Sequence, residues 1–197
     1  MFIEPLDVSV EDEVDAWAQE QTARWGYRPN YAAVFGSRPD VARAWTGLNL
    51  AVRDGMDRRR FELATIAAAR ALRSTYCTVA HSMFLRDACG DEATMVALAD
   101  DPEGTSLDAT DRAVVAFAGK VARRASEITQ DDVDALRAVG LSENDIADVI
   151  FAVGARCFFA TVLDAAGAEP DHQLGAALAT VTERLVVGRP IAAAPAS

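Results

Sequence analysis

The sequence predicts an all-α protein that folds as a single domain. Alanine is abundant, and most glycines and prolines fall between apolar stretches, which favours helices over strands. Within those stretches the apolar residues recur at steps of three and four, and no stretch alternates apolar and polar residues long enough to require a strand. A length of 197 residues suits one domain with one core. We therefore expect about eight to ten helices around that core.

The first helices follow an extended lead-in over residues 1–10. Acidic residues at positions 11–13 indicate a helix over 11–24, because the N-terminal end of a helix dipole favours negative charge. Gly26 and Pro29 then predict a loop over 25–30. Pro39 suits the first turn of the next helix, and Gly55 ends it. That helix carries a core stripe made of Val41, Trp45, Leu48 and Val52.

Two helices are predicted over residues 57–72 and 74–89, doubling back on each other after a short break at Arg73-Ser74. Ser74 favours an N-cap, since its hydroxyl accepts hydrogen bonds from the free amides of the following turn. Gly90 is a suitable C-cap for the second helix.

The second half of the chain continues the helical pattern. A short helix over 91–99 is followed by a loop over 101–104, the predicted hinge between two halves. Helices are then expected over 108–125 and 130–138. Residues 142–145 resemble a capping box, which predicts a long apolar helix ending at Ala166. A last helix is expected over 172–187, so we expect one domain over 1–187 and a flexible tail over 188–197.

Charge and cysteine content exclude several classes of function. The net charge of −11, from 19 basic and 30 acidic residues, disfavours binding to nucleic acid or to an anionic membrane. The three cysteines form no disulfide framework, and no zinc spacing or flavin or haem motif is present, so no cofactor is predicted. The N-terminus lacks the apolar core of a signal peptide. The longest apolar run, residues 149–163, is shorter than a membrane span and is predicted to be a buried core helix. A cytoplasmic protein is expected.

Three groups that exchange protons or electrons lie within residues 62–81. If Ser74 caps the second helix, Cys77 lies in its first turn, where free N–H groups and the helix dipole favour a thiolate. His81 lies four residues later and projects from the same face. Glu62 is flanked by apolar residues on the preceding helix, which suits a buried general base. The three side chains are therefore candidates for one site between two antiparallel helices.

Each of these residues also has a purely structural interpretation. Cys77 and His81 are equally consistent with a packed thiol and a hydrogen-bonded core histidine, and Glu62 with an exposed carboxylate. Ser74 is most simply a helix cap, although it is also placed to donate a hydrogen bond to a Cys77 thiolate. Tyr76 is interpreted as packing or as a pocket wall.

Four other residues are expected to serve the structure. Cys89 and Cys157 are interpreted as buried structural cysteines. Trp45 is expected in the core unless it lines the site. Arg156, inside the apolar run, is expected either to extend to solvent or to pair with an acid, and a position facing the pocket is the less favoured alternative.

The spacing of these residues resembles that of the carboxymuconolactone decarboxylase and alkylhydroperoxidase D-like superfamily. Redox members of that superfamily carry a Glu about a dozen residues before a Cys-x-x-Cys-x-x-x-His motif. Here Glu62 precedes Ser74 by twelve residues, and Cys77 and His81 follow Ser74 by three and seven. The resemblance covers roughly residues 25–170. It implies an AhpD-like all-α fold, a homo-oligomer (dimer, trimer or hexamer), and peroxide reduction by the motif cysteines with Glu and His relaying protons.

This chain departs from the superfamily pattern at Ser74, which stands where the first redox cysteine belongs. Cys77 matches the second cysteine, so the motif disulfide of the redox members cannot form. Cys89 is no substitute, because twelve helical residues place it about 18 Å along the axis from Cys77. The sequence leaves open whether Cys157 approaches Cys77.

Three functions remain open at this point. The first is an alkylhydroperoxidase-like oxidoreductase, in which Cys77 reduces a peroxide, Glu62 and His81 relay protons, and an external thiol completes the cycle. The second is a decarboxylase-like enzyme that uses Glu62 and His81 for acid–base chemistry on a small lactone or carboxylate. The third is a non-catalytic relative that keeps only the fold. The expected partners are a small-molecule substrate and, for the first function, a thiol reductant.

Overall fold

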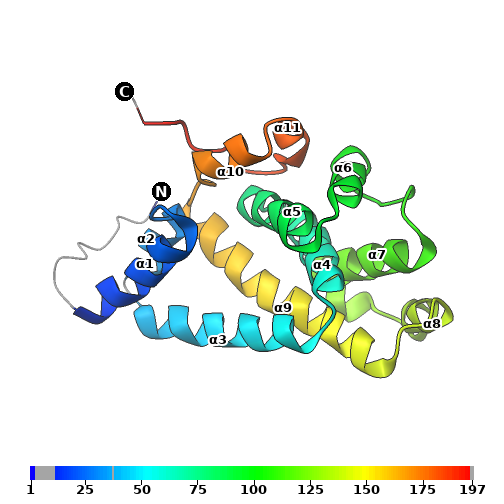
Figure 1. Ribbon diagram of the computed structural model, residues 1–197. Coiled ribbons are helices and arrows are strands. Elements are labelled where there is room, and N and C mark those ends of the chain that lie inside the picture. Colours follow the sequence, from blue (N-terminus) through cyan, green and yellow to red (C-terminus); the bar gives the residue numbers. More distant parts are fainter. Residues whose placement is uncertain (3–11, 37, 196–197) are drawn as a thin grey trace.

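The computed structural model describes residues 1–2, 12–36 and 38–195, and within them it contains eleven α-helices and no strand (Figure 1). This confirms the all-α class, with one helix more than the upper end of the expected range. The helices in the first half are α1 (Asp12–Trp25), α2 (Asn30–Phe35), α3 (Pro39–Gly55), α4 (Arg58–Ala71), α5 (Thr75–Cys89) and α6 (Glu92–Asp100). Those in the second half are α7 (Ala109–Arg124), α8 (Gln130–Ala138), α9 (Glu143–Ala166), α10 (His172–Ala177) and α11 (Thr182–Leu185), with a 3-10 turn at Ala125–Glu127.

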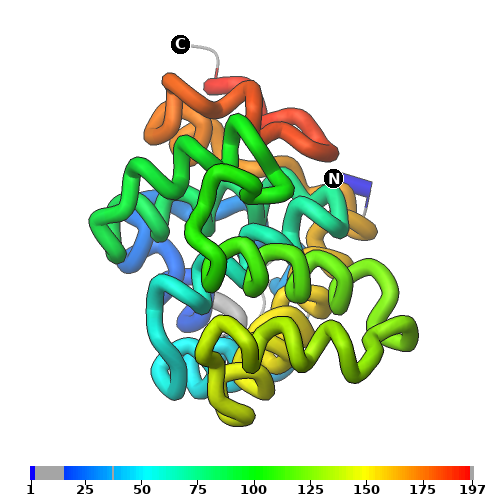
Figure 2. Tube along the Cα trace, turned by 90° about the vertical axis from the view of Figure 1, so that its right-hand side faces the viewer, coloured from blue at the N-terminus to red at the C-terminus, as the bar shows by residue number. Residues whose placement is uncertain are grey.

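Helix α4 forms the centre of the fold. Its nine consecutive residues from Phe61 to Ala69 are all buried, and α5, α7 and α9 pack around it (Figure 1). Four of the nine are alanines, which let neighbouring helices approach closely. Helices α10 and α11 lie at one end of the molecule, and α8 with the start of α9 lies at the other (Figure 2). A buried carboxylate on α4, at Glu62, therefore sits in the middle of the core.

Two parts of the chain differ from the sequence prediction. The sequence predicts a loop over residues 25–30 and no element over 31–36, whereas the structure has α2 at Asn30–Phe35. Its first amide, the N–H of Asn30, donates to the Asp171 carboxylate 2.7 Å away, a contact that joins distant segments. The single helix expected over 172–187 is two short helices, α10 and α11. The Thr182 hydroxyl donates to the carbonyls of Gly175 and Leu178, and such side-chain bonds compete with the helical ladder.

Helix α9 begins at a capping box formed by Ser142 and Asp145, as predicted. It is longer than the apolar run within it. By length and composition it is the one helix in the described part of the chain that could cross a membrane, and half of its most apolar window is buried. The run itself, residues 149–163, is shorter than a membrane span, but the helix that contains it is not. The helix has a buried side and an exposed apolar side.

A close contact between the start of α5 and the C-terminal segment fixes the turn before Cys77. Arg73 in that turn has a positive φ of 58°, which costs a non-glycine residue about 1–2 kcal/mol. Thr75, the first residue of α5, accepts hydrogen bonds from the amides of Val187 and Gly188. A Cβ on Gly188 would lie 1.9 Å from the Arg73 carbonyl oxygen, so only glycine fits there.

The segment after α11 also makes specific contacts. Arg189 donates to the Asp164 carbonyl at the end of α9, and the Ala192 amide donates to the Pro170 carbonyl. Residues 188–192 are therefore held against the body, whereas the sequence predicted a flexible tail from residue 188. Residues 196–197 lie outside the described part of the chain.

Candidate functional site

Helices α4 and α5 bring Glu62 and His81 into direct contact. The two helices double back through the turn at residues 72–74, so Glu62 on α4 meets His81 on α5. The Nδ1 atom of His81 lies 2.5 Å from Oε2 of Glu62. The other carboxylate oxygen, Oε1, accepts from Nε of Arg58 at 2.6 Å. Glu62 is fully buried, so both of its oxygens have the cationic or N–H partners that burial requires.

The charges of this pair follow from burial and from its partners. Burial alone would raise the pKa of Glu62, but His81 and Arg58 outweigh it and lower that pKa below its usual value. Burial, with the positive charge of Arg156, lowers the pKa of His81 to about 4 against the opposing effect of Glu62. At neutral pH the pair is therefore a carboxylate and a neutral imidazole. Nδ1–H donates to Glu62, and Nε2 remains as a base.

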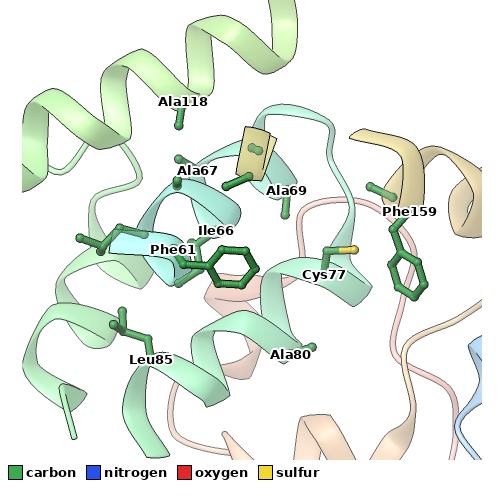
Figure 3. Packing of buried hydrophobic residues seen from close by; sticks show 14 of the residues in the cluster. Phe61, Ile66, Ala67, Ala69, Cys77, Ala80, Leu85, Ala118 and Phe159 are labelled. Carbon is green, nitrogen blue, oxygen red and sulfur yellow. The ribbon is translucent and has the colours of Figure 1, made fainter. Parts of the chain in front are cut away.

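Cys77 lies in the first turn of α5, as predicted, and is almost fully buried. Its sulfur points toward the side of α9 that carries Phe159 (Figure 3). A guanidinium on α9 contacts it, because Nη1 of Arg156 lies 3.6 Å from Sγ.

Arg156 is a buried cation without a carboxylate partner among the residues that the structure describes. Only 3% of its surface is exposed. Its Nη2 atom donates weakly to Oδ1 of Asn49 at 3.4 Å, and its Nε atom has no hydrogen-bond partner in the described residues. Its guanidinium also faces the rings of Trp45 and Phe159, at 5.8 and 5.5 Å from their centroids. The arrangement therefore places a buried positive charge beside the sulfur of Cys77.

Cys77, His81 and Arg156 line one cavity of about 80 Å³. Its other walls are largely aromatic. Trp45 and Phe159 stack at 4.1 Å between ring centroids, and Phe84 meets His81 edge to face at 5.5 Å. The polar lining includes Asn49 of α3 and Gln21 of α1. The cavity therefore suits a small, flat or apolar molecule that places one polar group near the thiol.

Tyr76 lines the same cavity and serves mainly to hold the fold together. Its hydroxyl donates to Oδ2 of Asp171, which precedes α10, and its oxygen receives the Tyr31 amide at 3.4 Å. Burial raises the pKa of Tyr76, and the nearby Asp171 carboxylate adds to this effect. The tyrosine is therefore a neutral hydrogen-bond donor in the wall. Of the two predicted roles, packing and pocket wall, it fills both.

Ser74 occupies the N-cap position of α5, but its hydroxyl makes no capping hydrogen bond. The side-chain cap was therefore the wrong prediction, although the helix begins at the expected place. Ser74 is fully buried and is not part of the cavity lining. No hydrogen bond joins its hydroxyl to Cys77 in the described residues.

The other two cysteines lie outside the cavity. All three thiols are free. Cys89 ends α5, and burial raises its pKa. Cys157 follows Arg156 on α9. Arg156 and Phe159 line the cavity, but Cys157 does not. Burial also raises the pKa of Cys157. Both cysteines are half-buried rather than buried.

Asn49 is not among the site residues that the sequence predicts, yet it lines the cavity. For Arg156 the sequence favours solvent or an acid over the pocket, whereas the structure places its guanidinium beside a thiol. Trp45 lines the cavity, which is the alternative to a place in the core. A signal for Arg156 was available, since it is the only charged residue in the apolar run 149–163. In the described residues, no three His, Cys, Asp or Glu side chains are placed to hold a metal ion.

Comparison with known proteins gives a family match and a common fold. Residues 39–103 match the model of the carboxymuconolactone decarboxylase family, and this segment contains Glu62, Cys77 and His81. No curated protein matches the chain. Several solved structures share its fold.

Two of the solved structures are peroxidase-related proteins. The AhpD-core protein from Ralstonia eutropha JMP134 is 22% identical with a TM-score of 0.77, covering 88% of this chain and 93% of that chain. The protein from Silicibacter sp. TM1040 is 23% identical with a TM-score of 0.75, covering 87% and 93%. A third is a cysteine-to-alanine variant of the debrominase Bmp8 with 2,3,4-tribromopyrrole, 17% identical with a TM-score of 0.75, covering 92% and 97%. At these identities the likeness establishes the fold alone.

Proposed function

We propose that this chain is a thiol-dependent oxidoreductase that reduces hydroperoxides with a single cysteine, Cys77, and the match of residues 39–103 to the carboxymuconolactone decarboxylase family supports this proposal. The observation that carries the proposal is the contact between Sγ of Cys77 and the buried guanidinium of Arg156. A packed, inert thiol needs no cation. A buried arginine with no carboxylate partner is stabilised when the thiol beside it is ionised.

The first chemical step forms a bond between sulfur and oxygen. The thiolate of Cys77 attacks the terminal peroxide oxygen, the O–O bond breaks, and the products are a sulfenic acid on Cys77 and an alkoxide. The alkoxide takes a proton and leaves as an alcohol. Nε2 of His81 is the site that takes the thiol proton and returns it to the alkoxide. Glu62 holds the ring through Nδ1 and stabilises the imidazolium formed between these events.

The second stage needs an external thiol. Ser74 offers no sulfur, and the other two cysteines lie outside the cavity. A small thiol attacks the sulfenic acid, releases water and leaves a mixed disulfide on Cys77. A second thiol then displaces Cys77 and regenerates it. Two thiols are oxidised to a disulfide for each peroxide reduced to an alcohol and water.

Peroxide consumption with dithiothreitol as the reductant tests this proposal. We expect cumene hydroperoxide to be consumed by the protein and by the Cys89→Ser/Cys157→Ser variant. Cys77→Ser is expected to abolish consumption. Dimedone should label Cys77 alone after a brief exposure to peroxide. Consumption that survives Cys77→Ser, or no consumption with any of several small thiols, contradicts the proposal.

A second candidate is favoured by the aromatic walls of the cavity. The stacked Trp45 and Phe159 rings suit a flat substrate, and the structurally similar Bmp8 is a debrominase determined with a bromopyrrole. A Cys77-dependent replacement of a ring bromine by hydrogen, with two thiols oxidised to a disulfide and HBr released, would use the same residues. Bromide release from brominated pyrroles, compared with peroxide consumption under the same conditions, distinguishes the two candidates.

The decarboxylase-like alternative differs in its dependence on sulfur. It would use only Glu62 and His81, so Cys77→Ser would leave it intact. Turnover of a small lactone carboxylate by the Cys77→Ser variant would therefore favour it over both thiol-dependent candidates.

A further inference from the structure

A second cavity lies where α4 and α7 end, and it shares no lining residue with the cavity beside Cys77. Its volume is about 480 Å³, against about 80 Å³ for the first. Its floor is apolar and buried, since Ala67 of α4 and Val115 of α7 belong to the core. Its rim includes the exposed residues Pro102 and Glu103. The cavity therefore reaches from the surface to the core and has the size of a small-molecule site.

Positive charge is concentrated in this cavity. Four basic side chains line it, together with the single acidic side chain of Glu103: Arg70, Lys120, Arg123 and Arg124. We call it the basic cavity. The whole chain has the opposite balance, with 19 basic and 30 acidic residues. The local excess of positive charge makes a small anion the ligand that this cavity attracts.

Helix dipoles explain part of this concentration. Helices α4 and α7 lie side by side and run in the same direction (Figure 1), because Arg59 near the start of α4 contacts Asp111 near the start of α7, and the ends of both helices line the basic cavity. The C-terminal end of a helix dipole favours positive charge. Two such ends together account for basic residues in these turns, but they do not decide which of those residues are paired with acids.

Lys120 and Arg124 are paired with acids of the protein. Nζ of Lys120 lies 2.5 Å from Oδ2 of Asp132, and Nη1 of Arg124 lies 3.2 Å from Oε2 of Glu127. The charges of these two residues are therefore compensated before any ligand binds.

Arg70 and Arg123 keep their positive charge for a ligand. Among the described residues neither forms an ion pair, and Arg70 donates only to the carbonyl oxygen of Arg184, at 3.4 and 3.5 Å. Burial lowers the pKa of Arg70, and no neighbouring anion opposes this effect. Nη2 of Arg123 lies 3.5 Å from the place that a Cβ on Gly119 would take, so Gly119 leaves room for this guanidinium against the floor of the cavity.

We propose that the basic cavity binds a small organic phosphate, with the phosphate group held by Arg70 and Arg123 and the apolar part over Ala67 and Val115. A guanidinium matches two phosphate oxygens with two parallel hydrogen bonds. A phosphate monoester carries a charge of about −1.5 to −2 at neutral pH, which balances two unpaired arginines better than one carboxylate does. This site is independent of the peroxide chemistry at Cys77.

The charge of the chain favours a dissolved molecule over a lipid headgroup as the source of the phosphate. An anionic bilayer would have to approach a protein with a net charge of −11, and the two surfaces repel each other. A dissolved monoester meets the basic cavity alone and leaves most of the acidic surface untouched.

The C-terminal segment gives the bound state a local signature. Val187 lines the basic cavity, and its amide donates to the Thr75 hydroxyl at 3.2 Å. A ligand over Val187 shields this contact from water. Exchange of the Val187 amide with deuterium should therefore slow when the cavity is filled.

Isothermal titration calorimetry with inorganic phosphate and with phenyl phosphate tests the proposal. We expect both to bind, and phenyl phosphate more tightly, because its ring covers the apolar floor. The Arg70→Gln/Arg123→Gln variant should bind phenyl phosphate about 100-fold more weakly, about tenfold for each charged partner removed. The matched control is Arg28→Gln/Arg112→Gln, which removes the same charge at exposed positions outside the cavity and should bind as the unmodified protein does. Circular dichroism shows whether each variant is folded.

Four results would overturn the proposal. The first is that the unmodified protein binds no phenyl phosphate, and the second is that the control variant loses as much affinity as Arg70→Gln/Arg123→Gln. The third is binding that Arg156→Met abolishes, or that leaves exchange at Val187 unchanged, since the anion would then lie outside the basic cavity. The fourth is binding to phosphatidylglycerol vesicles that Arg70→Gln/Arg123→Gln loses, which would assign the two arginines to a membrane surface.

Discussion

The candidate site contains two buried charged groups, and only one of them is paired with opposite charge. Glu62 has a partner for each carboxylate oxygen, His81 at 2.5 Å and Arg58 at 2.6 Å. Within the described part of the chain Arg156 has no carboxylate partner, and its hydrogen bonds go to a thiol and an amide oxygen. The negative charge of Glu62 is therefore compensated by groups of the protein itself. The positive charge of Arg156 is compensated only when an anion lies beside it, such as an ionised Cys77 or a bound substrate.

Substitutions at Glu62 and at Arg156 should therefore change the stability of the protein differently. Removing one partner from a compensated buried set leaves the other partner unpaired, which is costly. Removing Arg156 from a protein that also lacks the Cys77 thiol instead relieves a cost that the fold bears.

The largest effect is expected from Glu62→Gln. The amide keeps the shape of the side chain but cannot neutralise Arg58 or accept as strongly from the His81 N–H. We expect the free energy of unfolding to fall by about 3 kcal/mol, measured by urea denaturation at neutral pH. Arg58→Gln is the matched control, and it should cost less because the Arg58 side chain is 37% exposed. Equal losses for the two variants would contradict a fully compensated Glu62.

Acid is expected to destabilise the protein through His81. The pKa of His81 is about 4 in the folded protein, below its usual 6.5, so the unfolded chain binds a proton between these values and the folded protein does not. Stability from this residue is fully present above pH 6.5 and is lost as pH falls toward 4, by about 3 kcal/mol in total. Urea denaturation at several pH values measures it. In His81→Gln the free energy of unfolding should fall by about 3 kcal/mol less over the same pH range. An equal fall in the unmodified protein and in His81→Gln would show that another group causes it.

A double-mutant cycle measures the contact between Cys77 and Arg156. We expect Arg156→Met to destabilise the reduced protein, and the same change in a Cys77→Ser background to leave stability unchanged or slightly higher. The coupling free energy should be about 1.5–3 kcal/mol, the value of a hydrogen bond to a charged group. Urea denaturation of the four proteins gives it. A coupling near zero would show that the thiol does not compensate the guanidinium.

The smallest effect is expected from Tyr76→Phe. Asp171 is a buried carboxylate with neutral donors only, and burial raises its pKa, in contrast to that of Glu62. Losing the Tyr76 hydroxyl removes one donor and leaves the Asn30 amide, so we expect a loss of about 1 kcal/mol with peroxide consumption unchanged. Thermal unfolding and the peroxide assay check both parts. A large loss of activity would make Tyr76 more than a wall of the cavity.

The parts of the site predictable from sequence are those whose geometry is local. The offset from Cys77 to His81 is fixed by one helix, and Glu62 is brought close by one short turn, so spacing alone indicated all three. Arg156 and Asn49 come from α9 and α3, and their approach to Cys77 depends on how those helices pack against α4 and α5. No local pattern encodes that packing. The same applies to α2 and the break between α10 and α11, which depend on hydrogen bonds to distant or competing groups.

The contact between Thr75 and the C-terminal segment relates the site to the order in which parts of the protein fold. Thr75 receives its two hydrogen bonds from amides 112 and 113 residues later in the chain. The α4–α5 hairpin can form early from neighbouring residues, whereas this closure must wait for a contact between distant segments. We expect the Val187 and Gly188 amides to exchange with deuterium sooner than those of α4. The thiol site would then be the last part of the molecule to be completed on folding and the first to be released on heating.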